Sequence, residues 1–314
     1  MKLEEMKYFV EIVKARSINQ ASKTLFVAQP ALSRMLTALE KELGFPLLER
    51  SKHGITPTKA GLAVYADCVK ILQLYNDSKR RWQDIAYETA DTHTTVRIVA
   101  LPMICNSTMN QVFCEVAQKY PRIQLKLFER QLQDVLQETI SQSYTISISH
   151  YNEKTKDEIY QFAKTNQMQI IPLFDDEYKF FAGCNHPLIG EKITSEDFKE
   201  CTIANYSSPE TENMPQFIDA GLTGFLDKFK QVLYLSNRYI MMETAATTQA
   251  ITLSADCMTR DNIYRKNGTL VPLNVTDFYL PMTYFMMMRA EPSIEENIVA
   301  DILRRYYLAL AEQK

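Results

Sequence analysis

Glycine is scarce in this sequence, with only 8 among 314 residues, and the functional motifs that depend on glycine are missing. There is no GxGxxG for a dinucleotide, no Walker loop for a nucleoside triphosphate and no GxSxG around a nucleophilic serine. The HExxH motif of zinc enzymes is missing as well. We therefore expect a protein that is not an enzyme and that uses no cofactor.

Cysteine motifs and long apolar runs are also missing. The six cysteines form no CxxC pair and have no metal-like spacing with the four histidines. We expect them to be reduced and mostly buried, with no metal site; a redox-sensing pair is the alternative. No apolar run reaches the roughly 18 residues of a membrane helix. The charged N-terminus lacks the apolar core of a signal peptide, which predicts a cytoplasmic location.

Charge is distributed unevenly along the chain. Residues 1–90 carry 14 basic and 10 acidic side chains, whereas the remaining residues carry 21 basic and 28 acidic ones. A basic segment attached to an acidic body is typical of a nucleic-acid-binding module joined to a second domain.

The first 57 residues have the pattern of three helices followed by a short basic hairpin. Ser17 and Gln20 form a capping-box pattern that predicts the start of the second helix. Gln29-Pro30 opens the third, since proline is tolerated in the first turn. One face of this third helix is apolar, with Leu32, Leu36, Leu39 and Leu43. The other face is short, polar and basic, with Pro30, Ser33, Arg34, Thr37 and Lys41.

This arrangement predicts a winged helix-turn-helix that binds DNA. A recognition helix in the major groove needs one apolar face for its own core and one polar, cationic face for the bases. A polar helix face alone is usually only solvated, but here the helix spacing, the hairpin and the local charge agree. The predicted DNA-binding residues are Gln29, Pro30, Ser33, Arg34 and Thr37 on the helix, and Arg50, Lys52 and His53 on the hairpin.

A long helix is expected over 59–88, with Thr58 as its cap. Apolar or small residues recur in it with the roughly 3.5-residue period of a coiled-coil seam. The members of this seam are Val64, Cys68, Ile71, Tyr75, Ser78, Trp82 and Ile85. We expect the seam to pair two copies of the chain.

Beyond 91–95 the pattern changes to alternating strands and helices, which predicts an α/β domain. The expected strands include 168–173 and 178–183, and the expected helices include 213–220, 238–247 and 293–311. The methionines at 282 and 286–288 have strand spacing, and we interpret them as buried packing rather than a metal or flexible binding surface.

Several stretches carry a family resemblance: FVEIV at 9–13, SINQAS at 17–22, QPALSR at 29–34, PLLER at 46–50 and TKAG at 58–61. Together they resemble the DNA-binding domain of a LysR-type transcriptional regulator. His186-Pro187-Leu188, the run at 268–273 and the C-terminal helix are similar, more loosely, to the effector domain of that family. Ala28 departs from the family, which usually has serine there to cap the recognition helix and contact a phosphate.

The resemblance implies a winged helix-turn-helix over 1–58, a dimerisation helix over 59–90 and an effector-binding domain over 91–314. The last is expected to resemble a periplasmic binding protein, with two α/β lobes joined by two crossover strands. Lobe one would comprise 91–165 and 270–314, and lobe two 166–269. The resemblance also implies a dimer or tetramer, an interrupted inverted repeat in promoter DNA, contact with RNA polymerase and a small organic effector.

The effector of this family lies between the lobes, near strand C-termini and helix N-termini. Mapped onto this chain, the expected lining is Pro102, Ile104, Asn106, Glu129, Gln131, His150, Tyr151, Asn205, Tyr206, Ser207, Thr247 and Thr248. The apolar stretch at 101–105 favours a less polar ligand than a simple dicarboxylate. A ligand-binding protein with a vestigial helix-turn-helix is the alternative function, although Arg34 and Arg50 argue against it.

Overall fold

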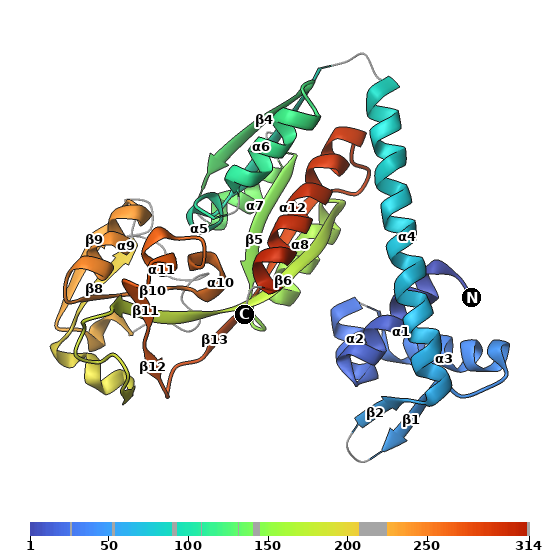
Figure 1. Cartoon of the computed structure of the whole chain (residues 1–314), viewed down its shortest axis with the longest axis horizontal. Coiled ribbons are helices and arrows are strands. Elements are labelled where there is room, and N and C mark those ends of the chain that lie inside the picture. The colour runs from blue at the N-terminus through green and yellow to red at the C-terminus, as the bar shows by residue number, and fades with distance from the viewer. Residues whose placement is uncertain are drawn as a thin grey trace. The chain divides into compact units, whose positions relative to one another are not determined.

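The computed structural model describes residues 1–25, 27–51, 54–89, 93–107, 109–130, 132–140, 145–206 and 225–312. The chain divides into two compact units, Met1–Thr89 and Ala90–Lys314 (Figure 1). The helix expected at 213–220 lies outside the described residues. No helix in the described ranges combines the length and the apolar character that crossing a membrane requires.

The first unit consists of three short helices, a hairpin and one long helix. Its elements are, in order, α1 (Leu3–Ala15), α2 (Ile18–Leu25), α3 (Gln29–Leu43), β1 (Leu48–Ser51), β2 (Gly54–Pro57) and α4 (Lys59–Thr89). Ser17 Oγ accepts a hydrogen bond from the Gln20 N–H at 3.2 Å, and Thr58 Oγ1 accepts one from the Gly61 N–H at 2.8 Å. These bonds satisfy N–H groups that a helix start leaves free, and they confirm both predicted helix starts.

The core of the first unit forms around α3. Leu32, Leu36 and Leu39 are buried against α1 and the residues that lead into the hairpin. The chain passes very close to itself at Gly61, where a Cβ would lie 1.9 Å from the carbonyl oxygen of Leu47. Only glycine fits there, and the first turn of α4 therefore docks directly on this core.

The second unit contains one large mixed sheet with the strand order β4-β3-β5-β13-β6-β10-β8-β9, and β11 pairs with β6. The strands of this sheet are β3 (Thr94–Ala100), β4 (Ile123–Glu129), β5 (Ile146–Tyr151), β6 (Met168–Gly183), β8 (Thr202–Tyr206), β9 (Gln231–Leu235), β10 (Ala250–Ala255), β11 (Leu270–Pro272) and β13 (Leu280–Arg289). Two short strands, β7 (Lys192–Ile193) and β12 (Asn274–Val275), pair with each other in a separate sheet. The helices of this unit are α5 (Pro102–Cys105), α6 (Met109–Lys119), α7 (Leu132–Ile140), α8 (Lys156–Thr165), α9 (Arg238–Thr247), α10 (Asp256–Thr259), α11 (Ile263–Lys266) and α12 (Ile294–Glu312), with 3-10 turns η1 (Ser195–Glu200) and η3 (Leu226–Lys228).

Two long strands, β6 and β13, join two lobes. They pair antiparallel from Leu280↔Tyr178 to Arg289↔Met168, and β13 also pairs with β5. The remainder of β6 pairs with β10 and β11 instead. Lobe one thus holds β3, β4 and β5, covered by helices that include α6 and α12, and lobe two holds β8, β9 and β10 (Figure 1). The predicted fold class, a helix-turn-helix unit with a two-lobed α/β domain, is confirmed.

The prediction of separate strands at 168–173 and 178–183 is wrong, because β6 runs unbroken through both. Acidic residues are disfavoured in strands, so the run Asp175-Asp176-Glu177 is not typical of one. Asp176 is buried, however, and its carboxylate accepts the N–H groups of Cys257 and Glu177.

The strand pairing also moves the expected lobe boundaries. Residues 168–174 pair with β13 beside β5 and belong to lobe one, not lobe two. The segments at 270–272 and 274–275 pair with the far end of β6 and with β7, which places them in lobe two. Met282 and Met286–Met288 are buried in β13, as the packing interpretation expected.

Candidate DNA interface and effector site

Helix α3 presents an exposed polar face opposite its buried leucines. Gln29, Pro30, Arg34 and Thr37 are exposed and Ser33 is half-buried. Thr37 Oγ1 donates its proton to the backbone oxygen of Ser33 at 3.0 Å, which leaves the hydroxyl as an acceptor. The structure thus brings the five predicted helix residues onto one accessible surface, with amide, hydroxyl and guanidinium groups.

The N-terminus of α3 has no side-chain cap. Ala28 occupies the N-cap position, and its methyl group cannot accept a hydrogen bond from the first turn. N–H groups at a helix start are suited to phosphate oxygens when no side chain satisfies them. Compared with the serine that the family usually has here, Ala28 therefore provides neither a side-chain cap nor a side-chain contact to phosphate.

The hairpin expected at 47–57 is present. Strands β1 and β2 pair antiparallel from Leu48↔Pro57 to Ser51↔Gly54, and Arg50 lies in β1 opposite Ile55. Lys52 and His53 lie outside the described residues, and the side chain of Arg50 is not described.

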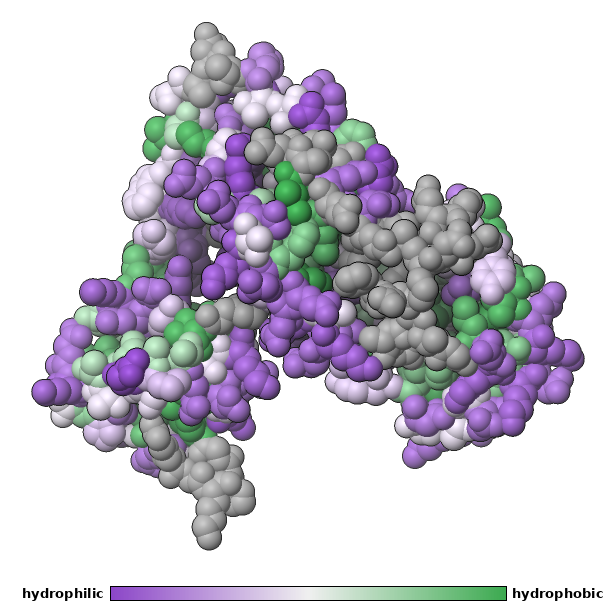
Figure 2. Space-filling model, turned by 180° about the vertical axis from the view of Figure 1, so that it is seen from behind, coloured by the Kyte–Doolittle hydropathy of each residue, from purple (hydrophilic) through white to green (hydrophobic). Residues whose placement is uncertain are grey.

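The predicted seam of α4 divides into a buried part and an exposed part. Val64 and Cys68 pack into the core of the first unit, because the contact at Gly61 holds the first turns of α4 against that core. Those two positions are therefore unavailable to a second copy. Of the other seam members, Ile71, Trp82 and Ile85 are 43–58% exposed, and Tyr75 and Ser78 are half-buried. Leu74, which was not a predicted seam member, is 63% exposed on the same face, and we call Ile71, Leu74, Trp82 and Ile85 the α4 stripe. Figure 2 shows that hydrophilic residues make up most of the coloured surface in view, with smaller hydrophobic patches between them.

In lobe one, the structure separates two predicted effector residues. His150 and Tyr151 are neighbours on β5, so their side chains point to opposite faces of the sheet. Tyr151 is buried and stacks on Phe285 with ring centroids 5.5 Å apart, in a core beneath α8. His150 lies edge-on to Tyr178 and Tyr284, at 6.2 and 5.6 Å between ring centroids. Only His150 thus faces the crossing between the lobes.

The turn of α5 is a packed structure after β3. Pro102 and Ile104 are buried, and the backbone oxygen of Ile104 accepts a hydrogen bond from the Tyr307 hydroxyl at 3.3 Å. Asn106 is exposed, and its Nδ2 donates to the backbone oxygen of Pro102 at 2.8 Å. Glu129 is exposed at the end of β4, where it pairs in register with the last residue of β3.

In lobe two, Asn205 and Tyr206 are half-buried at the end of β8, whereas Gln131 of lobe one and Ser207 lie outside the described residues. Thr247 and Thr248 end α9, and their hydroxyls donate to carbonyl oxygens one turn earlier. The next strand, β10, runs from there back to Ala255, which pairs with Tyr178 at the crossing. Contrary to the prediction, both threonines therefore lie away from the crossing.

Several residues at the crossing were missed in the sequence. With His150 they form what we call the crossover cluster: Met103, His150, Tyr178, Arg238 and Tyr284. The sulfur of Met103 accepts hydrogen bonds from the Tyr284 and Tyr178 hydroxyls, at 2.8 and 3.9 Å. Arg238 is the first residue of α9, and its guanidinium donates to Ser254 Oγ. Tyr178 and Tyr284 come from the two long strands, so locating the crossing would have identified them.

Burial controls the protonation of this cluster. It lowers the pKa of His150 to about 4 and raises that of Tyr178 to about 12. Burial also raises the pKa of Tyr284. The imidazole and both phenols are therefore uncharged near neutral pH, and Arg238 is the cation among them.

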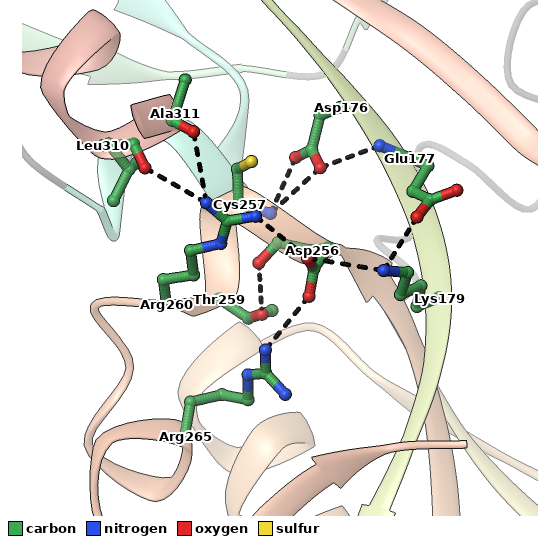
Figure 3. A network of polar contacts seen from close by, with 10 residues as sticks. All are labelled: Asp176, Glu177, Lys179, Asp256, Cys257, Thr259, Arg260, Arg265, Leu310 and Ala311. Carbon is green, nitrogen blue, oxygen red and sulfur yellow. Dashed lines mark hydrogen bonds and ion pairs between the residues drawn. The ribbon is translucent and has the colours of Figure 1, made fainter. Parts of the chain in front are cut away.

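A second polar network connects the lobes at α10 (Figure 3). Asp256 accepts hydrogen bonds from Arg260 and Arg265, each at 3.1 Å. Arg260 also donates to the carbonyl oxygens of Leu310 and Ala311, at 3.3 and 3.5 Å. Because α12 belongs to lobe one and α10 to lobe two, Arg260 ties the C-terminal turn of one lobe to the other.

Within the described ranges, no group of three or more His, Cys, Asp or Glu residues could hold a metal ion. All six cysteines are free thiols. Cys68 and Cys257 are buried, Cys105 and Cys201 are half-buried, and Cys114 and Cys184 are exposed. The expectation that most of the cysteines are buried is therefore wrong.

The fold and these sites define a class: winged helix-turn-helix proteins with a two-lobed α/β domain. Residues 3–62 match the family model described as "Bacterial regulatory helix-turn-helix protein, lysR family", and residues 89–300 match "LysR substrate binding domain". The chain belongs to the LysR family.

Relatives include HTH-type transcriptional regulator BsdA of Bacillus subtilis (strain 168), 26% identical over 184 residues, which are 58% of this chain and 61% of BsdA. Nitrogen assimilation regulatory protein nac of Klebsiella aerogenes is 47% identical over 73 residues, which are 23% of this chain and 24% of nac. Both alignments thus span less than two thirds of the relative. CrgA, a LysR-type transcriptional regulator from Neisseria meningitidis, has the same fold, with a TM-score of 0.57, 18% identity and coverage of 100% of this chain and 99% of CrgA.

Proposed function

We propose that this protein is a sequence-specific, DNA-binding transcriptional regulator whose activity is modulated by a small-molecule effector. The observation that carries the proposal is the exposed face of α3, where Gln29, Ser33 and Arg34 stand opposite a buried leucine face. A helix with this division fits the major groove, where Arg reads guanine and Gln reads adenine through paired hydrogen bonds. Arg50, Lys52 and His53 of the hairpin contact the phosphate backbone or the adjacent minor groove.

The effector on this proposal is a small organic molecule bound between the lobes, with no cofactor. The crossover cluster supports this location, because it takes Met103 and His150 from lobe one and Arg238 from lobe two. A ligand that contacts both lobes favours one lobe arrangement over others. The change alters DNA bending and contact with RNA polymerase, and the protein has a binding role without a catalytic step.

Two copies pair through the α4 stripe, as a dimer or as a dimer of dimers. The stripe supports this step because exposed apolar side chains recur along one face of a long helix. A two-fold symmetric dimer reads two half-sites, which predicts an interrupted inverted repeat near a promoter. Such a protein works in the cytoplasm, where promoter DNA and RNA polymerase are found.

A gel-shift assay with DNA from upstream of the protein's own gene tests the proposal. The full chain should bind a promoter-proximal inverted repeat, and binding should weaken steeply as salt rises because phosphate contacts release counterions. A shuffled repeat of the same composition is the control. Absence of salt-sensitive binding to any such repeat would contradict the proposal and favour a ligand-binding protein with a vestigial helix-turn-helix.

A further inference from the structure

Arg238 is a buried cation for which the described residues provide no buried counter-charge. Its side chain is 9% exposed, and Ser254 Oγ accepts the hydrogen bond it makes within the described part of the chain. A guanidinium has several N–H donors, and one hydroxyl leaves most of them unused. No carboxylate among the described residues lies within ion-pair distance of Arg238.

The described groups whose charge acts on Arg238 include one carboxylate, and it is exposed. Three of these groups are the phenols of Tyr178, Tyr206 and Tyr284, and the carboxylate is that of Glu129 at the end of β4. Burial keeps the Tyr178 and Tyr284 phenols protonated by raising their pKa values. Removing a charge from water has a large free-energy cost unless an opposite charge compensates for it, so the guanidinium is suited to an anion that the described residues do not provide.

The same groups limit the kind of anion. Burial lowers the pKa of His150 to about 4, so the imidazole adds no second positive charge. Met103 offers a sulfur atom in contact with the hydroxyls of Tyr178 and Tyr284, whose aromatic rings lie beside it. The carboxylate whose charge acts on both phenols, that of Asp176, already accepts the N–H groups of Glu177 and Cys257. One cation beside apolar and aromatic groups suits one negative charge attached to an apolar body.

We propose that Arg238 forms the ion pair with a small organic monocarboxylate, whose apolar body packs against Met103, Tyr178 and Tyr284. This inference rests on the proposed effector-binding function, and it names the chemical class of the effector. The carboxylate provides two acceptor oxygens to a fork of N–H donors, an arrangement that lysine cannot reproduce. Because Arg238 belongs to lobe two and Met103 to lobe one, the ligand joins the lobes.

The unliganded protein provides a test that does not depend on the ligand. Arg238→Met has a similar length and removes the uncompensated charge, so it should raise the Tm of the full chain by about 2–4 °C. Arg260→Met is the matched control: Arg260 bonds to Asp256 and to carbonyl oxygens of α12, and its loss should lower Tm. A lower Tm for Arg238→Met would show that Arg238 has a structural role and would overturn the inference.

Ligand binding is tested by thermal shift and titration calorimetry with phenylacetate and 3-phenylpropionate, each paired with its uncharged amide. The acids should raise the Tm of the wild type and of Arg260→Met, and the amides should not. Arg238→Met and Arg238→Lys should bind the acids on the order of 30-fold more weakly or worse. Equal binding of acid and amide, an undiminished response in Arg238→Met, or no response of the wild type to either acid would overturn the inference.

The gel-shift assay separates this inference from the proposed function. If Arg238 is required for phenylacetate binding but no DNA is bound, the regulator proposal fails and the carboxylate site stands. If DNA is bound but neither acid binds, the regulator proposal stands and the monocarboxylate assignment fails.

Discussion

Replacing Glu115 by glutamine removes one charge from the interior of lobe one and keeps the shape of the side chain. Glu115 lies on α6 and is 8% exposed. Its two carboxylate oxygens accept hydrogen bonds from Arg305 of α12, at 2.9 and 3.1 Å, and one of them also accepts from Lys119 at 2.9 Å. The carboxylate thus fastens the C-terminal helix to α6.

The expected cost follows from the pKa of this carboxylate. Burial alone would raise the pKa of Glu115, but the hydrogen bonds from Arg305 and Lys119 outweigh burial and lower it from 4.5 to about 2. At about 1.4 kcal/mol per pKa unit, the shift corresponds to roughly 3 kcal/mol. Arg305 is 44% exposed, and solvent screens part of its charge. We therefore expect Glu115→Gln to lower the free energy of unfolding at neutral pH by about 2 kcal/mol.

The stability difference between the wild type and Glu115→Gln should depend on pH in one direction. The folded pKa lies below the unfolded one, so the stabilisation is fully present above the ordinary value of 4.5 and is lost as the pH falls toward about 2. The difference should therefore be constant between neutral pH and about pH 5 and shrink below that.

Urea unfolding of the full chain, followed by far-ultraviolet circular dichroism at several pH values, measures this difference. Glu200→Gln is the control, because Glu200 pairs with Lys230 at 3.1 Å but both side chains are exposed, and its loss should change stability by less than about 1 kcal/mol. Equal stability of the wild type and Glu115→Gln at neutral pH would refute the reasoning, as would a difference that does not shrink in acid.

Three further predictions concern the first unit. Arg34→Ala should reduce the preference for specific over random DNA by about 1–3 kcal/mol in competition gel shifts, because Arg34 is proposed to contact bases. Arg50→Ala should weaken binding to specific and random DNA alike, because Arg50 is proposed to contact phosphates; the reverse pattern would assign the base contact to Arg50. Leu74→Glu should shift the chain toward monomers in sedimentation velocity, while Gln73→Glu, on the opposite face of α4, should not; an unchanged mass for Leu74→Glu would exclude the α4 stripe as the pairing surface. Gly61→Ala should destabilise the first unit by more than about 2 kcal/mol in thermal unfolding, because the new Cβ meets the Leu47 carbonyl oxygen, and a wild-type Tm would contradict that contact.

Much of the helical part of the fold was predictable because its signals are local, but α8 (Lys156–Thr165) was not among the expected helices. The leucine spacing of α3, the Ser17 cap of α2 and the Thr58 cap of α4 each lie within a few residues of the feature they predict. α9 was expected at 238–247 and has those bounds. α5, α10 and α11 have four residues each, too short for helical periodicity to be visible.

The crossing between the lobes was less predictable because long-range pairing creates it. The acidic run at 175–177 looks like a loop until Asp176 accepts two backbone N–H groups, one of them from Cys257, far along the chain. Arg238 is unremarkable in sequence, and its burial depends on strands that come from several distant segments. The division of the α4 seam into a buried and an exposed part likewise follows from the contact of Gly61 with Leu47, which precedes the hairpin. Periodicity within α4 cannot reveal that contact.

The pairing of β6 with β13 determines how the lobes can move. Both strands continue from one lobe to the other and remain hydrogen-bonded to each other up to Tyr178 and Leu280. A rotation of one lobe against the other must therefore twist a two-stranded ladder, and its hydrogen bonds oppose the twist. A single unpaired segment between the lobes would allow them to rotate more freely. The register shifts between Tyr284 and Phe285, which leaves Leu173 without a partner on β13. A bulge disrupts a ladder locally, so we expect the ladder to bend first at Leu173 if the proposed effector changes the angle between the lobes.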